Sequence, residues 1–95
     1  MARKRLVFRV HAIQRMLERG IDVEDVHYVL ETGEVIEDYP DDKPYPSRLV
    51  LGRQRSRLLH VVAADDPKGD EVIVITVYEP NAAQWESDFR RRRRP

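Results

Sequence analysis

The chain has 95 residues and a mass of 11.2 kDa, which is enough for one small domain with a single core. It contains no cysteine, which excludes disulfides, cysteine-ligated zinc and thiol nucleophiles and is typical of a reducing compartment. The sequence has neither an apolar run long enough to span a membrane nor a secretory signal. We therefore expect a cytoplasmic protein without membrane contact.

The formal net charge of zero hides a segregation of charge along the chain. Residues 90–94 are five consecutive arginines, which leaves 12 basic against 17 acidic residues, a formal charge of −5, in residues 1–89. This pattern suits a polyanion or an acidic partner better than a membrane surface, unless the arginines and the acidic middle of the chain neutralise each other. We expect a single domain at residues 1–89 and a basic tail at residues 90–95.

Periodicity in the first third of the chain predicts a short strand followed by two helices. Residues 6–10 are suited to a strand, and residues 11–19 then switch to helical spacing, with Gly20 in the position of a C′ glycine. Asp22 is a candidate N-cap for a second helix that ends at Gly33. The apolar positions of the first helix are Ala12, Ile13, Met16 and Leu17. Because the connection is short, the two helices should form a compact hairpin.

The rest of the chain reads as β-structure. The expected strands are residues 34–39, 48–53, 58–64 and 72–78. A tight turn at residues 66–69 joins the last two strands. Asn81 is placed to cap a final helix, whose Trp85 and Phe89 would pack on the sheet or form an exposed aromatic stripe for a protein partner. The order predicts an α+β domain, with an N-terminal short strand and helical hairpin packed on one face of a four- to five-stranded antiparallel sheet.

Motifs for metal, nucleotide and serine-hydrolase sites are missing. The three histidines, His11, His27 and His60, are 16 and 33 residues apart and form no metal-binding pair. The sequence contains no glycine-rich phosphate loop and no nucleophile elbow around a serine. We therefore expect neither a metal nor a cofactor.

Basic side chains are spaced to form a stripe on the first helix. His11, Arg15 and Arg19 occur at positions i, i+4 and i+8, so they should lie along one face beside the apolar positions. The stripe is either a cationic surface presented to phosphate or an ordinary solvated side of the helix.

A histidine, a threonine and a tyrosine are expected on one face of the sheet. Side chains alternate along a strand, and the purely apolar faces should pack on the helices. These faces are Leu59, Val61 and Ala63 in one strand and Ile73, Ile75 and Val77 in its neighbour. His60, Thr76 and Tyr78 would then share the open face, a set suited to binding and cutting RNA without a metal. The alternative is a structural histidine in an ordinary amphipathic strand.

Motifs along most of the chain resemble those of one family. They are residues 11–21 (His-Ala-x-x-Arg-Met-x-x-Arg-Gly-Ile), 33–40 (Gly-Glu-Val-Ile-Glu-x-Tyr-Pro), 59–62 (Leu-His-Val-Val) and 75–80 (Ile-Thr-Val-Tyr-Glu-Pro), followed by Trp85. In this order they are similar to a small prokaryotic domain of unknown function, DUF4258. The resemblance implies distant kinship with RelE/ParE-type toxins, which have a helical hairpin before an antiparallel sheet. It also implies a cognate antitoxin as partner, often one with a zinc-binding Cys-x-x-Cys domain.

These observations together predict a toxin-like component of a toxin–antitoxin pair, acting as a metal-independent endoribonuclease on RNA. The expected catalytic residues are His60 as general acid or base, Tyr78 as a second proton donor or stacking platform, Arg15 as part of a phosphate clamp, and His11. The expected substrate-binding residues are Arg19, Thr76, Arg90, Arg91, Arg92, Arg93 and Arg94. We expect a monomer or a weak homodimer. The alternative function is a non-catalytic module that binds a protein or nucleic acid through its sheet and tail.

Overall fold

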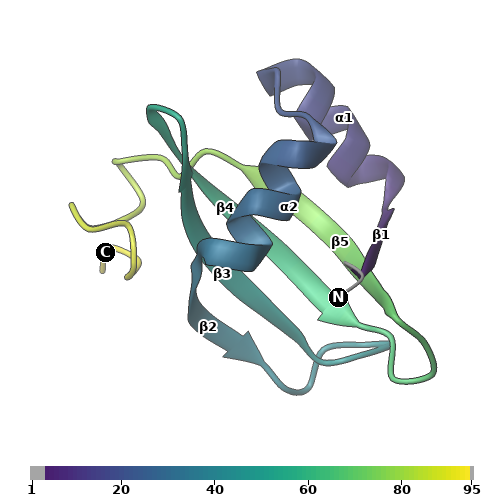
Figure 1. Cartoon of the computed structure of the whole chain (residues 1–95). Coiled ribbons are helices and arrows are strands. Elements are labelled where there is room, and N and C mark those ends of the chain that lie inside the picture. Colours follow the sequence, from purple (N-terminus) through teal and green to yellow (C-terminus); the bar gives the residue numbers. More distant parts are fainter. Residues whose placement is uncertain (1–3, 95) are drawn as a thin grey trace.

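The structure, a computed structural model, describes residues 4–94, so residues 1–3 of the expected domain and residue 95 of the expected tail lie outside the described residues. Its elements are β1 (Arg5–Phe8), α1 (Val10–Arg19), α2 (Val23–Thr32), β2 (Glu34–Tyr39), β3 (Ser47–Gln54), β4 (Arg57–Asp65) and β5 (Glu71–Tyr78). The two helices lie over one face of a five-stranded sheet (Figure 1). The expected α+β architecture is confirmed.

The sheet is mixed, so the expectation of a purely antiparallel sheet is wrong. Its strand order is β1-β5-β4-β3-β2, and the four later strands form an antiparallel meander. β1 lies parallel to β5, with Arg5 opposite Glu71 and Phe8 opposite Val74. The helical hairpin and the meander separate these two strands in the sequence, and a parallel pair requires such a long crossover. The four-residue β1 has no local partner, and its alternation does not specify its direction.

The helical hairpin forms where the capping residues predict it. Gly20 ends α1 with a φ of +64°, and its N–H donates to the carbonyl of Met16. Asp22 and Asp25 form a capping box at the start of α2, in which each carboxylate accepts from the backbone N–H of the other. The buried stripe of α1 is narrower than expected, because Ala12 and Met16 are buried while Ile13 and Leu17 are 43% and 79% exposed.

Close packing sets the distance between α2 and the sheet. A Cβ atom built on Gly52 of β3 would lie 2.8 Å from Cγ1 of Val29, so only a glycine lets the helix approach this closely. Val29 and Val26 are fully buried there, and they pack against the buried side chains of β4. α2 is therefore fixed over the middle of the sheet, which leaves the opposite face for another segment.

A bulge in β5 changes which of its side chains face the helices. Val62 pairs with Thr76, but the next residue of β4, Ala63, pairs with Val74, so Ile75 is an extra residue. Val72, Val74 and Val77 belong to the core beneath the helices, instead of the expected Ile73, Ile75 and Val77. The bulge nevertheless leaves Thr76 and Tyr78 on the face that carries His60.

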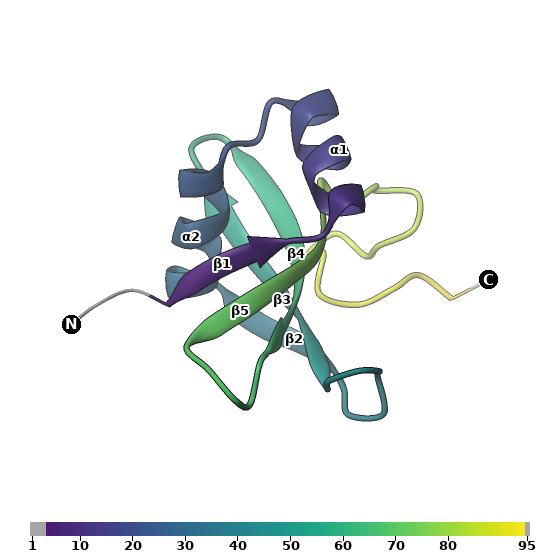
Figure 2. The same ribbon diagram turned by 90° about the vertical axis from the view of Figure 1, so that its right-hand side faces the viewer.

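Residues 80–94, which we call the strap, cover the face of the sheet away from the helices. Figure 2 shows α2 and the yellow-green strap on opposite sides of the strands. The expected final helix is wrong: Asn81 caps only a short turn, with its side chain accepting from Ala83 N–H at 2.8 Å. Trp85 is 1% exposed and pairs with Arg92 in an antiparallel bridge. The tryptophan therefore packs on the sheet, as one of the two interpretations predicts.

The hairpin between β3 and β4 holds the junction of the two helices. Arg57 donates to the carbonyls of Arg19 and Gly20 at 2.8 and 2.7 Å. Gln54 donates to the buried carboxylate of Asp25 at 2.9 Å, and the guanidinium of Arg57 lies 3.8 Å from that carboxylate. These contacts join the ends of both helices to one turn of the sheet.

Asp25 should make the stability of the protein depend on acid. Burial raises the pKa of its carboxyl group, but the backbone N–H of Asp22, the amide of Gln54 and the charges of Arg55 and Arg57 outweigh burial and leave the pKa below its usual value. Because the pKa of Asp25 is lower in the folded than in the unfolded protein, the ionised carboxylate stabilises the fold fully at a pH above the unfolded pKa of about 3.9. This stabilisation is lost as the pH falls through the lower pKa of the folded protein. We expect Asp25→Asn to lower the free energy of unfolding by about 1 kcal/mol at pH 7.

Urea titrations of parent and variant between pH 7 and pH 3 measure this effect. The two midpoints should converge as the pH falls through the lowered pKa. Asp38→Asn, at an exposed position of β2, is the matched control and should leave the pH profile unchanged. Parallel profiles for Asp25→Asn and its parent would contradict the assignment.

Candidate functional site

His60 of β4 lies at the centre of the covered sheet face. It pairs across the sheet with Tyr78 of β5, and its Nδ1 lies 3.1 Å from the Tyr78 hydroxyl. Its Nε2 lies 2.9 Å from the backbone carbonyl of Phe89 in the strap. The side chain is fully buried, so the expectation that His60 lies on an open face is wrong. The strap, which the sequence predicts only as a helix and a tail, covers it.

The hydrogen bonds of His60 determine which ring nitrogen carries the proton. A carbonyl oxygen only accepts, so Nε2 must donate its proton to Phe89. Burial lowers the pKa of the imidazole, the bond to Phe89 raises it, the positive Arg92 lowers it and Glu37 raises it, and the net pKa lies below the usual value. The ring is therefore neutral near pH 7, its Nδ1 is an acceptor, and the Tyr78 hydroxyl donates to it.

Aromatic contacts fix the imidazole between two rings. The Trp85 ring lies edge-on to His60 with a centroid distance of 4.4 Å, and Tyr78 lies edge-on at 5.2 Å. The guanidinium of Arg92 sits 4.6 Å from the centroid of the Trp85 ring, in a cation–π contact. The strap thus contributes an indole, a carbonyl and a cation to the surroundings of His60.

A pocket of about 270 Å³ opens beside this group. It is lined by Arg15, Thr76, Tyr78, Gln84, Trp85 and Arg92. The lining offers two guanidinium groups, two hydroxyls, an amide and an indole, and no carboxylate. A concave site with cations and hydrogen-bond donors but no acid is suited to an anion such as a phosphodiester. We call it the Arg15–Arg92 pocket.

The structure brings together some of the predicted site residues and separates others. Arg15, Thr76 and Tyr78 line the Arg15–Arg92 pocket, and His60 lies directly behind Tyr78. His11 and Arg19 are exposed on α1 and do not line it. The guanidinium of Arg15 has no hydrogen bond or ion pair with another of residues 4–94, so its charge is available to a ligand.

The arginines of the predicted tail mostly contact the protein itself. Arg90 donates through Nε and Nη2 to Glu34 at 3.0 and 2.6 Å, and Arg91 lies 3.8 Å from Glu86. Arg93 donates to the carbonyl of Ala82 at 2.8 Å. Arg92 stacks on Trp85 and reaches the Arg15–Arg92 pocket, and Arg94 is exposed. Contacts within the chain therefore neutralise the charges of Arg90 and Arg91. Among the five arginines of the tail, Arg92 is the one that lines the Arg15–Arg92 pocket.

Sequence reasoning missed three contributors from the strap: Gln84, the ring of Trp85 as a wall of the pocket, and the carbonyl of Phe89. All three lie in the segment that the sequence predicts as a helix. A helix would have used the Phe89 carbonyl differently, and no side-chain pattern indicates a backbone acceptor. The one sequence signal for these contributors is the single tryptophan of the chain, because an indole usually packs against other side chains.

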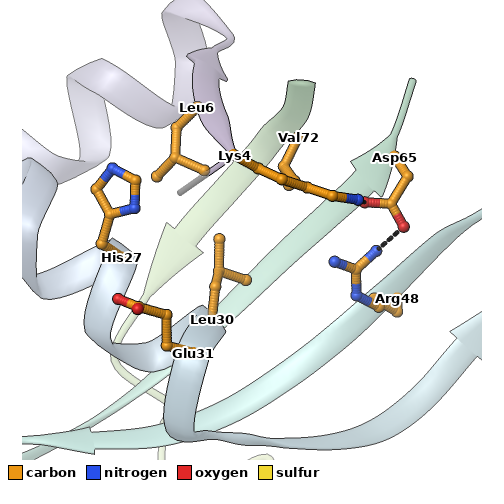
Figure 3. A pocket seen from close by; sticks show the side chains of 8 residues that line it. All are labelled: Lys4, Leu6, His27, Leu30, Glu31, Arg48, Asp65 and Val72. Atoms are coloured by element: carbon orange, nitrogen blue, oxygen red, sulfur yellow. Dashed lines mark hydrogen bonds and ion pairs between the residues drawn. The ribbon is translucent and has the colours of Figure 1, made fainter. Parts of the chain in front are cut away.

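A second pocket of about 270 Å³ lies on the other side of the sheet (Figure 3). Leu6, Leu30 and Val72 form an apolar floor, and Lys4, His27, Glu31, Arg48 and Asp65 surround it. Asp65 pairs with Arg48 at 3.1 Å and with Lys4 at 3.7 Å, so these charges largely neutralise one another. None of the predicted site residues lines this pocket, and its mixed charges select no anion.

Within residues 4–94, no three histidine, aspartate or glutamate side chains gather as a metal site would require. No helix in this part of the chain has the length and apolar character needed to cross a membrane.

Comparison with known proteins identifies a family. The family model described as "Domain of unknown function (DUF4258)" matches residues 8–79. The match covers most of the chain, and the protein belongs to this family. No curated protein and no solved structure matches it. The strap lies beyond the matched residues, so the family match includes Arg15, His60, Thr76 and Tyr78 but not Trp85, Phe89 or Arg92.

Proposed function

We propose that the protein is a toxin-like component of a toxin–antitoxin pair that binds RNA in the Arg15–Arg92 pocket and cleaves it without a metal. The observation that supports this function best is the lining of the pocket, where two arginines and the Tyr78 hydroxyl converge without any carboxylate. Two guanidinium groups can clamp a phosphate and stabilise the charge that develops on it during cleavage.

The hydrogen bonds behind the pocket suggest how a proton would move. The 2′-hydroxyl of the ribose attacks the adjacent phosphorus and gives its proton to the Tyr78 oxygen, while Tyr78 passes its own proton to Nδ1 of His60. The bond from phosphorus to the 5′-oxygen breaks, and the leaving oxygen takes a proton from water. The hydroxide that remains takes back, through Tyr78, the proton held by His60, which returns the imidazole to its neutral form. The products are a 2′,3′-cyclic phosphate and a 5′-hydroxyl. His60 thus acts through Tyr78 as a positioned base and does not contact the RNA.

Such a protein should have related toxins, a partner protein and a place of action in the cell. We propose a RelE/ParE-like kinship for the fold, a cognate antitoxin as partner and a cytoplasmic site of action. The helical hairpin on one face of the sheet agrees with that kinship. Co-purification of the protein with the product of a neighbouring short reading frame, in one complex of defined stoichiometry, tests the partner.

Two variants separate binding from cleavage. Arg15→Gln should weaken RNA binding about 10-fold or more, because a charge-assisted contact to phosphate is lost. Tyr78→Phe should lower the cleavage rate of bound RNA about 100-fold, because the proton-transferring hydroxyl is removed, and should weaken RNA binding by no more than about 10-fold, the contribution of one hydrogen bond. Filter binding and single-turnover cleavage of an end-labelled oligoribonucleotide, both with a chelator present, measure these effects.

Matched controls lie elsewhere on the surface. Arg53→Gln removes an exposed arginine that does not line the Arg15–Arg92 pocket, and Tyr28→Phe removes a hydroxyl from the exposed side of α2. Both should bind and cleave as the parent does. Equal losses for Arg15→Gln and Arg53→Gln would show that only the overall charge matters.

A non-catalytic binding module is the second candidate, and the burial of His60 favours it. Both ring nitrogens are occupied, and the low pKa of the imidazole opposes the protonation that a base must undergo. In this case the parent binds RNA through the same pocket but leaves the oligonucleotide intact at all enzyme concentrations. Binding that depends on Arg15 without any cleavage decides for this candidate.

A further inference from the structure

The backbone of the strap has an unusual conformation at Phe89, the residue whose carbonyl contacts His60. Phe89 has a φ of +59°, in the left-handed region that residues other than glycine seldom adopt. This conformation turns the Phe89 carbonyl toward Nε2 of His60. Such a residue stays in place only where its surroundings hold it. The contacts on either side of Phe89 therefore decide whether the imidazole keeps its acceptor.

Three contacts hold Phe89 in this position. Its own N–H donates to the carbonyl of Glu86 at 2.8 Å, and the next N–H, that of Arg90, donates to the carboxylate of Asp88 at 3.0 Å. Both contacts are local to the strap. The third is the double hydrogen bond from the Arg90 side chain to Glu34 at the start of β2, which ties this turn of the strap to the sheet.

The direction of the Tyr78 hydroxyl follows from the Phe89 carbonyl. While Nε2 donates to Phe89, Nδ1 must accept, and the proton of Tyr78 points at His60. The Tyr78 oxygen then offers only lone pairs to the pocket. Without the carbonyl, a neutral ring can carry its proton on either nitrogen, and a proton on Nδ1 would turn the Tyr78 hydroxyl toward the pocket as a donor.

We propose that Arg90 is a positioning residue: through Glu34 it holds the Phe89 carbonyl on His60, and this makes the Tyr78 oxygen a hydrogen-bond acceptor in the Arg15–Arg92 pocket. Beside two guanidinium groups, an acceptor of fixed direction favours a ligand that combines a phosphate with a neighbouring hydroxyl. A ribonucleotide has this combination, since its 2′-hydroxyl lies beside the phosphodiester, and a deoxyribonucleotide lacks it. The pocket therefore distinguishes RNA from DNA. This last consequence rests on the proposed function, whereas the position of the proton does not.

The tautomer of His60 is measurable in the free, full-length protein. Long-range proton–nitrogen spectra of the protein with ¹⁵N-labelled histidine identify the protonated ring nitrogen. We expect His60 to carry its proton on Nε2 in the parent and to lose this single tautomer in Arg90→Gln and in Glu34→Gln. The double variant Arg90→Glu with Glu34→Arg restores the pair with its charges exchanged and should restore the tautomer. Arg91→Gln, in the neighbouring ion pair within the strap, is the control and should resemble the parent.

Each outcome bears on the proposal. A proton on Nδ1 in the parent overturns it directly, whatever the variants do. An unchanged tautomer in folded Arg90→Gln and Glu34→Gln overturns the role of the pair, and a double variant that fails to recover the parent spectrum does the same. Recovery in the double variant supports it, because an effect of lost charge or general loosening would not be reversed.

The preference for RNA is tested separately, with one oligonucleotide prepared as ribose and as deoxyribose. The parent should bind the ribose form about 10-fold more tightly, the worth of one good hydrogen bond, and Tyr78→Phe should remove the difference. Equal affinities in the parent, with the Nε2 tautomer present, overturn the selection of a hydroxyl and leave the positioning by Arg90 standing. Absence of any nucleic-acid binding counts against the proposed function, while the spectra still decide the role of Arg90.

Discussion

Replacing His60 by alanine is expected to lower the free energy of unfolding by about 3 kcal/mol. The imidazole is fully buried between the rings of Trp85 and Tyr78, so its removal leaves a cavity that these rings cannot fill by small shifts. It also leaves the carbonyl of Phe89 and the hydroxyl of Tyr78 without their partner. Both effects fall on the contact between strap and sheet, which should be the first part of the fold to loosen.

Urea denaturation followed by the fluorescence of Trp85 measures this loss, because the single tryptophan lies against the replaced ring. The melting temperature should fall by more than about 10 °C, given that about 1 kcal/mol corresponds to several degrees in a domain of this size. His11→Ala, at an exposed position of α1, is the control and should stay within about 0.5 kcal/mol of the parent. A His60→Ala variant as stable as this control would show that the strap does not depend on the histidine.

This stability effect also determines how activity data on His60 should be interpreted. A loss of RNA cleavage in His60→Ala would follow from a detached strap as readily as from a missing base. Tyr78→Phe avoids this ambiguity, because the ring remains in contact with His60 and only one hydroxyl is lost. Tyr78 and Arg15 are therefore the residues whose replacement tests the function.

Replacing Arg57 by glutamine should cost about 2 kcal/mol of stability, although its side chain is partly exposed. Its guanidinium donates to two carbonyls at the end of α1 and pairs with Glu79 at 3.3 Å. It also lies beside the buried carboxylate of Asp25, which would lose one of its two positive neighbours, Arg55 being the other. Water can replace part of these contacts, which keeps the expected cost below that of His60→Ala.

Thermal and urea unfolding of Arg57→Gln measure the effect, with Arg53→Gln in the same strand hairpin as the control. Arg53 is exposed, so its replacement should change the free energy of unfolding by no more than about 0.5 kcal/mol. Adding Asp25→Asn to Arg57→Gln should cost less than the sum of the two single changes, because the two groups share one interaction. Strict additivity would mean that the two side chains do not interact.

Local sequence signals predicted the elements that depend on local interactions. Gly20 and Asp22 marked the end of α1 and the start of α2 because capping involves only the adjacent turn of backbone. The turn at residues 66–69 likewise predicted the antiparallel pairing of β4 and β5. Period-two alternation placed His60, Thr76 and Tyr78 on one face, even though the bulge at Ile75 changed the apolar residues opposite them.

The features that were missed depend on contacts between distant segments. Nothing near β1 indicates that its neighbour is β5 or that the two strands are parallel. Residues 81–89 have helical spacing of their apolar side chains, but Asn81 and Asp88 bind the backbone two residues ahead and favour turns over a continuous helix. Once the helix is absent, Trp85 can fold back over His60, which converts the expected open site into a covered imidazole beside a pocket.

The parallel pairing of β1 with β5 also constrains the order in which the protein can form during translation. Of the five strands of this sheet, β1 leaves the ribosome first, and it must wait for residues 71–74, its neighbours in the finished sheet, before it can pair with β5. The meander from β2 to β5 joins strands that are adjacent in the sequence, so it can assemble as it emerges, whereas the edge formed by β1 closes last. Until that moment the apolar side chains of Leu6 and Phe8 lack the neighbours they have in the native core, and the nascent chain is most exposed to aggregation and proteolysis.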